Sequence, residues 1–205
     1  MRIPIGRVQL EGELQATPDS RGIIVFAHGS GSSRLSPRNR QVAEYLRSSG
    51  DFGTLLFDLL TPEEDRDYER RFDISLLAER LVAVTDWLRQ QHGEVAPAIG
   101  YFGASTGAAA ALVAASRRDD IAAVVSRGGR PDLAGEALKG VKAPTLLIVG
   151  GADAQVIGLN EAAMSSMPGT VELAIVPHAT HLFEEPGALE EVSRLARVWF
   201  ERYLT

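Results

Sequence analysis

The sequence predicts an α/β protein with a mostly parallel, doubly wound sheet and helices on both faces. Short apolar runs rich in β-branched residues recur along the chain, which is typical of strands buried on both faces. Segments with helical periodicity lie between these runs, as in a chain of βα units. We find no repeat, low-complexity tract or linker. Residues 1–205 are therefore expected to form a single domain, which is usual for this length.

The strands are assigned from apolar runs that end in glycine, proline or polar turn residues. An earlier segment differs, because Val8, Leu10 and Leu14 broadly alternate with polar residues. Such alternation predicts an exposed edge strand at the start of the chain. The buried strands are expected at Ile23–Ala27, Thr54–Phe57, Ala98–Phe102, Ala122–Val125, Thr145–Val149 and Val171–Val176.

The helices are assigned from apolar residues that recur every three or four positions. One such stripe is formed by Leu77, Leu81, Val84 and Leu88, and another by Val192, Leu195, Ala196, Trp199 and Tyr203. Two shorter helices are expected near Pro37–Arg47 and Leu159–Met164. The charged segment Pro62–Arg71 is interpreted as a solvated loop rather than a cover over the site.

The composition excludes several classes of function. The chain has no cysteine, so disulfides, thiolate metal sites and a cysteine nucleophile are all ruled out. Its net charge of −6 argues against binding to nucleic acid or to an anionic membrane. No apolar run is long enough for a signal peptide or a membrane span. We therefore expect a cytoplasmic protein that acts on a small molecule.

The segment Gly103-Ala104-Ser105-Thr106-Gly107 follows a predicted buried strand and has the form G-x-S-x-G. A nucleophilic serine must stand on a tight strand-to-helix turn, so residues two positions away must lack bulk. The alanines that follow would let the next helix pack close to the sheet. Ser105 is therefore the candidate nucleophile, and the alternative is a turn whose small residues serve only packing.

The glycine-rich segment 28–33 follows the Ile23–Ala27 strand. Its backbone N–H at Ser30, together with that of Thr106, is expected to form an oxyanion hole. The alternative is a flexible connecting loop. A phosphate-binding P-loop fits less well, because no Gly-Lys-Ser/Thr follows.

An acid and a base are expected after the last two predicted strands. Asp153 is placed where a carboxylate could orient an imidazole, although Asp132 after the preceding strand is a competitor. His181 is preferred to His178 as the base, because it lies farther from the strand end on a loop that can reach Ser105. The order serine, aspartate, histidine is that of the α/β-hydrolases. Such a triad needs no metal or organic cofactor.

These motifs resemble the dienelactone-hydrolase-like branch of the α/β-hydrolases. The sequence is similar to hydrolase domains that accompany a phosphoribosyltransferase domain in some proteins. The resemblance implies an α/β-hydrolase fold with no large lid and a carboxylic ester hydrolase with a Ser-His-Asp triad. It rests on HGSGSS at 28–33, SPRN at 36–39, LLFDLLT at 55–61, GASTG at 103–107, LLIVGGAD at 146–153 and HATHLFEEPG at 178–187.

The sequence departs from the family pattern at two positions. Dienelactone hydrolases proper use a cysteine nucleophile, whereas this chain has Ser105. We therefore expect hydrolysis of small carboxylic esters or lactones through an acyl-enzyme, rather than ring opening of dienelactone itself. Related sequences usually have glycine where this chain has His178, which further favours His181 as the base.

Arginines near the expected site suggest an anionic substrate. Arg127 and Arg130 follow a strand on the catalytic side, and Arg34 and Arg38 follow the glycine-rich loop on the same side. An arginine fork matches a carboxylate well. The alternative is that Arg127 or Arg130 pairs with Asp132, Asp58 or a helix end.

Two other functions stay open on the sequence. A thioesterase or peptidase would use the same triad, so the residues do not separate these from an ester hydrolase. A non-catalytic binding module on the hydrolase fold is the alternative from another class. The full set of Ser105, Asp153 and His181 argues against that alternative. The sequence does not indicate an oligomeric state.

Overall fold

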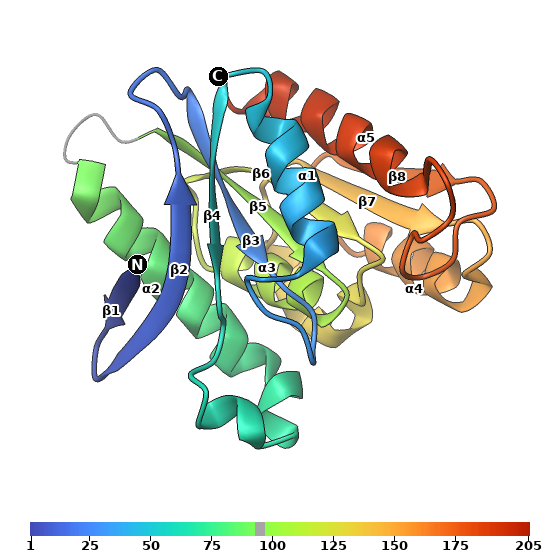
Figure 1. The fold of residues 1–205 in the computed structure, drawn as a ribbon. Coiled ribbons are helices and arrows are strands. Elements are labelled where there is room, and N and C mark those ends of the chain that lie inside the picture. The colour runs from blue at the N-terminus through green and yellow to red at the C-terminus, as the bar shows by residue number, and fades with distance from the viewer. Residues whose placement is uncertain (93–96) are drawn as a thin grey trace.

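The computed structural model describes residues 1–92 and 97–205, and in these residues eight strands form one sheet covered by helices on both faces (Figure 1). The strand order is β1-β2-β4-β3-β5-β6-β7-β8. The first two strands pair antiparallel, β2 is also antiparallel to β4, and the remaining pairs are parallel. This is the doubly wound α/β sheet that the sequence predicts.

The elements have the following bounds. The strands are β1 (Arg2–Ile5), β2 (Val8–Gln15), β3 (Gly22–Ala27), β4 (Phe52–Phe57), β5 (Ala98–Ala104), β6 (Ile121–Arg127), β7 (Thr145–Gly150) and β8 (Val171–Val176). The α-helices are α1 (Pro37–Arg47), α2 (Ile74–His92), α3 (Thr106–Ser116), α4 (Ala154–Met164) and α5 (Ala188–Tyr203). The 3₁₀ segments are η1 (Glu64–Arg66), η2 (Glu69–Phe72) and η3 (Pro131–Gly140).

The sheet separates two apolar cores. Helices α1 and α5 pack together on one face, and α2 and α3 pack together on the other (Figure 1). Successive residues of a strand point to opposite faces, so Tyr101 of β5 lies in the α2–α3 core while Phe102 lies in the α1–α5 core. Both side chains are fully buried. Burying an aromatic ring of this kind stabilises the fold by about 1.5–3 kcal/mol.

Most predicted elements are confirmed, and one helix is longer than expected. Helix α1 has the predicted bounds, and the apolar stripes of α2 and α5 face the cores. Helix α4 begins at Ala154 instead of near Leu159. Gly158 lies in the first half of α4 and is a poor helix former, so the sequence pattern does not indicate the first turns of this helix.

The two edges of the sheet correct the sequence prediction. Strand β2 was expected at the edge, but β1 pairs along it and forms the edge instead. Four residues are too few for β1 to show a pattern. Strand β8 was expected to be buried, but it is the opposite edge of the sheet, and its Ile175 is exposed. An edge strand has a neighbour on one side alone, so its apolar side chains are only partly covered.

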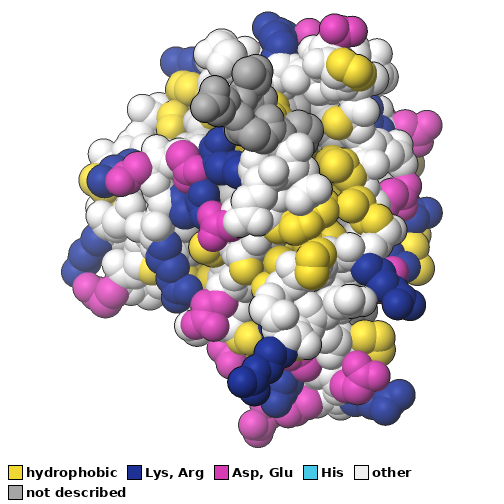
Figure 2. Space-filling view, turned by 90° about the vertical axis from the view of Figure 1, so that its left-hand side faces the viewer, with side chains coloured by type: hydrophobic (Ala, Val, Ile, Leu, Met, Phe, Trp, Pro, Cys, Tyr) yellow, Lys and Arg dark blue, Asp and Glu magenta, His cyan; other side chains and the backbone are white. Residues whose placement is uncertain are grey.

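The outer surface carries charges of both signs. Figure 2 looks at the molecule from the β1 side and shows basic and acidic side chains interspersed, with hydrophobic side chains grouped between them. Within residues 1–92 and 97–205, no helix is long and apolar enough to cross a membrane.

His28 joins the end of β3 to the segment that follows β4. Its Nδ1–H donates to the Gly29 carbonyl at 2.9 Å, and its Nε2 accepts the Leu59 N–H at 3.0 Å. Both bonds require the neutral ring with its proton on Nδ1. Burial lowers the pKa of His28 below its ordinary value of 6.5, against weaker opposing effects of the Gly29 carbonyl and nearby carboxylates.

The buried neutral His28 predicts a loss of stability at mildly acidic pH. The unfolded chain takes up a proton on this residue below about pH 6.5, whereas the folded chain does not. The free energy of unfolding should therefore fall with pH below that point, by up to about 1.4 kcal/mol per pH unit. Urea denaturation from pH 7.5 to 5 should show a smaller slope for His28→Asn than for the wild type. Ser165→Ala, a change at an exposed residue that does not titrate, should keep the wild-type slope. Equal slopes in all three proteins would contradict a neutral His28.

Candidate active site

Ser105 occupies a strained turn between β5 and α3. Its φ of 53° and ψ of −121° lie in a region that residues other than glycine rarely adopt. Three hydrogen bonds hold this backbone in place. The Ser105 N–H donates to the Arg127 carbonyl at 3.1 Å, and the Ser105 carbonyl accepts from the N–H groups of Ala108 and Arg130. Strain of this kind persists where the surroundings over-determine it, and it is common at functional sites.

The two glycines of G-x-S-x-G are required by close packing. A Cβ at Gly103 would lie 2.4 Å from the Ala108 Cα, and one at Gly107 would lie 2.2 Å from the Ala27 carbonyl oxygen. Both are backbone contacts that cannot give way. Helix α3 consequently starts directly against β3 and β5, and its residues from Thr106 to Ala115 are all buried. The turn thus points Ser105 out of the sheet edge.

The structure brings Ser105, His181 and Asp153 together. His181 Nδ1 lies 2.8 Å from Asp153 Oδ2, and His181 Nε2 lies 3.4 Å from Ser105 Oγ. The carboxylate only accepts, so Nδ1 carries the proton and Nε2 is left to accept from the serine. The Nε2–Oγ distance is at the long end of the range for a hydrogen bond, as is common in sites without substrate.

The two competing residues lie elsewhere. Asp132 forms a bidentate ion pair with Arg130, at 2.8 and 2.7 Å. His178 is exposed and adopts a φ of 63°, in the left-handed region that favours glycine.

The loop that carries His181 is fixed by small residues on neighbouring strands. A Cβ at Gly150 would lie 2.3 Å from the Ala179 carbonyl, and the Ala152 N–H donates to this same carbonyl at 2.9 Å. Gly128 has a φ of 52°, and a Cβ there would lie 3.1 Å from the His181 carbonyl. The sequence interpretation did not assign Gly128 a role, although the pair Gly128-Gly129 after β6 was a visible signal.

The two expected oxyanion donors are neighbours. The Ser30 N–H donates to the Thr106 hydroxyl at 2.7 Å, so the glycine-rich loop is tied to the first residue of α3. A Cβ at Gly29 would lie 3.2 Å from the Ser105 Cβ, which shows how closely this loop approaches the nucleophile. The Ser30 N–H is therefore directed at the Thr106 side chain in this state.

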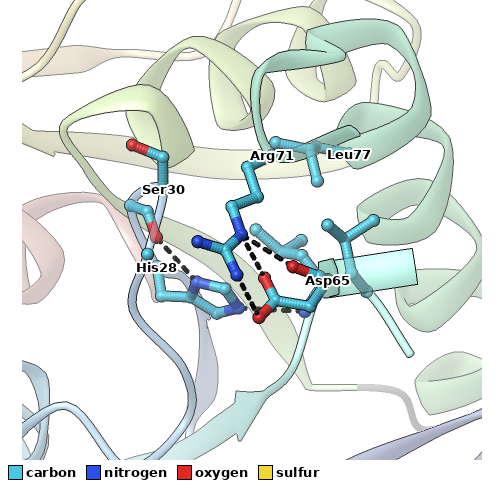
Figure 3. A pocket seen from close by; sticks show the side chains of 9 residues that line it. His28, Ser30, Asp65, Arg71 and Leu77 are labelled. Atoms are coloured by element: carbon cyan, nitrogen blue, oxygen red, sulfur yellow. Dashed lines mark hydrogen bonds and ion pairs between the residues drawn. The ribbon is translucent and has the colours of Figure 1, made fainter. Parts of the chain in front are cut away.

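A small pocket lies beside the glycine-rich loop (Figure 3). His28 and Ser30 form one side, and Asp65 and Arg71 form the other. The Arg71 guanidinium donates to the Asp65 carbonyl at 2.8 Å and to its carboxylate at 3.1 Å, and Leu77 lies behind them. The cavity holds about 10 Å³, room for about one water molecule, and an adjoining hollow on the Asp58 side holds about 110 Å³.

The charged segment after β4 is largely exposed, as its interpretation as a solvated loop predicts, but part of it packs beside the site. It forms η1 and η2, and Asp65 and Arg71 from these turns line the pocket beside the glycine-rich loop. The high charge of the segment predicts exposure to solvent. Its charges are paired with each other, as in Arg71–Asp65, or with α2, as in Glu64–Arg80.

The three arginines proposed as substrate ligands have different environments. Arg34 donates to Asp58 from both its backbone and its guanidinium, and Arg130 is held by Asp132. Arg127 is buried and donates to the Asn39 side chain at 3.3 Å. Burial lowers the pKa of Arg127 to about 10, and the positive charge of Arg38 acts in the same direction.

The described residues offer no site with the donors of a metal centre. Within residues 1–92 and 97–205, no group of three or more His, Asp or Glu side chains is placed to hold an ion.

Comparison with known proteins identifies the family. The model of the dienelactone hydrolase family matches residues 15–203. Two curated proteins of Mycobacterium tuberculosis, from strains CDC 1551 and H37Rv, are each 58% identical to this chain over all of its 205 residues. Both are named putative phosphoribosyl transferase. The chain spans 46% of their length, so it is similar to about half of each relative.

Solved structures agree with this result. The crystal structure of a dienelactone hydrolase from Anabaena variabilis has a TM-score of 0.95 and 55% identity, with 100% of this chain and 97% of that chain covered. Est1E from Butyrivibrio proteoclasticus, solved with ferulic acid, has a TM-score of 0.82 at 17% identity, covers 99% and 98% of the two chains, and shares the fold. The resemblance indicated by the motifs is confirmed: this chain belongs to the dienelactone hydrolase family and has the α/β-hydrolase fold.

Proposed function

We propose that this hydrolase cleaves small carboxylic esters or lactones through an acyl-enzyme on Ser105. The observation that carries the proposal is the continuous chain of contacts from Asp153 through His181 to Ser105, at 2.8 and 3.4 Å. It stands at the carboxyl ends of three different strands, where this class of sheet binds its ligands. Membership of a hydrolase family supports the same assignment.

In the first half of the reaction, Ser105 Oγ attacks the ester carbonyl carbon while His181 Nε2 takes the hydroxyl proton. Asp153 keeps the imidazole in the required tautomer and stabilises its positive charge. Collapse of the tetrahedral intermediate breaks the ester C–O bond, and His181 returns the proton to the departing alkoxide. Water then attacks the acyl-enzyme with His181 as base, which releases the acid and restores Ser105.

The developing oxyanion would be held by the N–H groups of Thr106 and Ser30. Thr106 is the first residue of α3, so its N–H needs no partner within the helix, and the helix N-terminus favours negative charge there. The Ser30 N–H is bound to the Thr106 hydroxyl at 2.7 Å. Substrate binding would therefore require this N–H to be shared, or the Thr106 side chain to rotate.

The glycine-rich loop, which approaches Ser105 at Gly29, also lines a small pocket. The pocket between the glycine-rich loop and Arg71 is narrow, and Leu59 and Leu60 contribute apolar lining. We propose short acyl and alcohol groups, because this pocket has room for only about one water molecule. Arg34 and Arg130 are occupied by aspartates, so among the three arginines proposed as ligands an anionic substrate would have to be recognised by Arg127.

Replacing Ser105 tests the proposed function. Ser105→Ala removes the nucleophile, so kcat on an acetyl ester should fall by at least about 10⁴-fold. The wild type should hydrolyse this ester faster than the thioester and amide with the same acyl group. Steady-state kinetics on the three substrates measures both effects.

Ser165→Ala serves as the matched control, because this exposed serine bonds only its own helix on α4. Both variants should unfold at the wild-type temperature. Retention of more than about a tenth of the esterase activity in a folded Ser105→Ala protein would refute the acyl-enzyme. A marked preference for the amide would assign the site to a peptidase.

Replacing the acid distinguishes Asp153 from Asp132. Asp153→Asn keeps the shape of the side chain but no longer stabilises the tautomer with its proton on Nδ1, so kcat should fall by about 10³–10⁴ with little change in KM. Asp132→Asn loses only an ion pair with Arg130, and its kcat should stay within about tenfold of the wild type. The reverse order of effects would place the acid at Asp132.

A further inference from the structure

Arg127 is the one charged side chain that is buried among the residues the structure describes. It is the last residue of β6 and is 7% exposed. Its side chain enters the α1–α5 side of the sheet, where it meets Asn39 on α1 and the Phe183 ring. Its carbonyl accepts the Ser105 N–H, and Phe183 is two residues from His181. Arg127 therefore lies directly beside the proposed catalytic residues.

The charge of Arg127 is not compensated by the chain that the structure describes. A guanidinium has five N–H donors, and the Asn39 side chain accepts from one nitrogen, Nη2. The buried Nε has no hydrogen-bond partner, and within residues 1–92 and 97–205 no carboxylate lies within 4 Å of the group. Buried charges are normally paired, because an uncompensated one is strongly destabilising.

A second arginine adds to the positive charge. Arg38 lies close enough to lower the pKa of Arg127 by repulsion. Its Nη1 pairs with Glu184 at 2.9 Å on the surface, while its buried Nε also has no hydrogen-bond partner in the described chain. Arg38 is thus a second positive charge near Arg127, and its described acidic partner, Glu184, binds it at the surface.

The N-terminus of α1 also lies beside Arg127, because Asn39 in its first turn accepts from the Arg127 guanidinium. This helix has 11 residues, and Arg38 and Asn39 both belong to its first turn, which contains no acidic residue. The first N–H groups of a helix are free of intrahelical partners and attract negative charge. The Ser36 side chain caps one of them, at Asn39. Pro37 has no N–H and the Arg40 N–H donates to the Ser36 carbonyl, so the Arg38 N–H is the one first-turn donor left to add to the positive potential around Arg127.

We propose that Arg127, Arg38 and the first turn of α1 form a binding site for an oxyanion, a carboxylate or phosphate group. An oxyanion placed there accepts from the free guanidinium N–H groups and removes the repulsion between the two arginines. The anion is either free in solution or part of the hydrolysed ester. The second case rests on the proposed function, whereas binding of a free anion does not.

Direct binding of inorganic phosphate tests the site without any use of activity. The protein is titrated with sodium phosphate by calorimetry and thermal unfolding, with sodium chloride at equal ionic strength as the reference. We expect saturable binding, and a rise in Tm of roughly 5–10 °C at a hundred times the Kd. Arg127→Met replaces the guanidinium with an apolar chain that fits the buried space, and it should weaken phosphate binding at least about tenfold.

Two further variants make the result decisive. Arg38→Gln also weakens binding and serves if Arg127→Met fails to fold. Arg202→Gln removes one positive charge from an exposed pair with Glu172, and should bind as the wild type does. In phosphate-free buffer, Arg127→Met should be at least as stable as the wild type, because it removes an uncompensated buried charge. No saturable phosphate binding, or equal binding by the wild type and both site variants, would overturn the proposal.

The source of the anion is distinguished by kinetics. If the group belongs to the substrate, phosphate should compete with a carboxylate-bearing ester but not with its neutral methyl ester, and Arg127→Met should lose the preference between them. If the anion is free, phosphate should change kcat on both esters alike. A protein that binds phosphate but has no esterase activity would retain the anion site while refuting the proposed function.

Discussion

The turn at Ser105 is the constraint on which the rest of the site depends. Ser105, which is not a glycine, is held at a φ of 53° because α3 begins at the next residue and packs directly against the sheet. Gly103 and Gly107 allow the backbones to approach to a distance that no side chain would permit. The Arg127 carbonyl, which accepts the Ser105 N–H, and the Arg130 N–H, which donates to the Ser105 carbonyl, then fix the strained residue from β6 and the turn that follows it. The packing of α3 in the core thereby sets the direction of one partly buried hydroxyl.

Parallel pairing brings the remaining groups to this hydroxyl. Strands β3, β5, β6, β7 and β8 end at the same edge of the sheet, so the loops that follow them meet there. The loop with His181 is held by backbone contacts at Gly150 and Ala152, and the segment after β3 is held by Arg34 on Asp58. These contacts keep the loops around the proposed acid and base in place.

The fold and the proposed triad were accessible from the sequence because both follow local rules. Apolar runs reveal buried strands, and residues that follow such strands are placed at one edge by topology alone. Ser105, Asp153 and His181 were proposed in this way, and the structure places their side chains next to one another. The edges of the sheet were less accessible, because β1 is too short for a pattern and β8 is as apolar as a buried strand.

Contacts that depend on three-dimensional pairing could not be predicted from the sequence. Nothing in the order of residues shows that Arg34 and Arg130 are paired with aspartates while Arg127 is buried without one. The packing of Arg71 and Asp65 beside the glycine-rich loop could not be predicted either, because a charged segment is expected to be solvent-exposed. Gly128 shows its role only when its distance to His181 is known.

The most direct test of this account is to treat the protein with a fluorophosphonate and map the adduct by mass spectrometry. The reagent phosphonylates a serine only when a base and an oxyanion site activate it. The account predicts a single adduct, on Ser105, which is lost in His181→Ala. No adduct under conditions that label a known serine hydrolase fully, or an adduct on another serine, would contradict it.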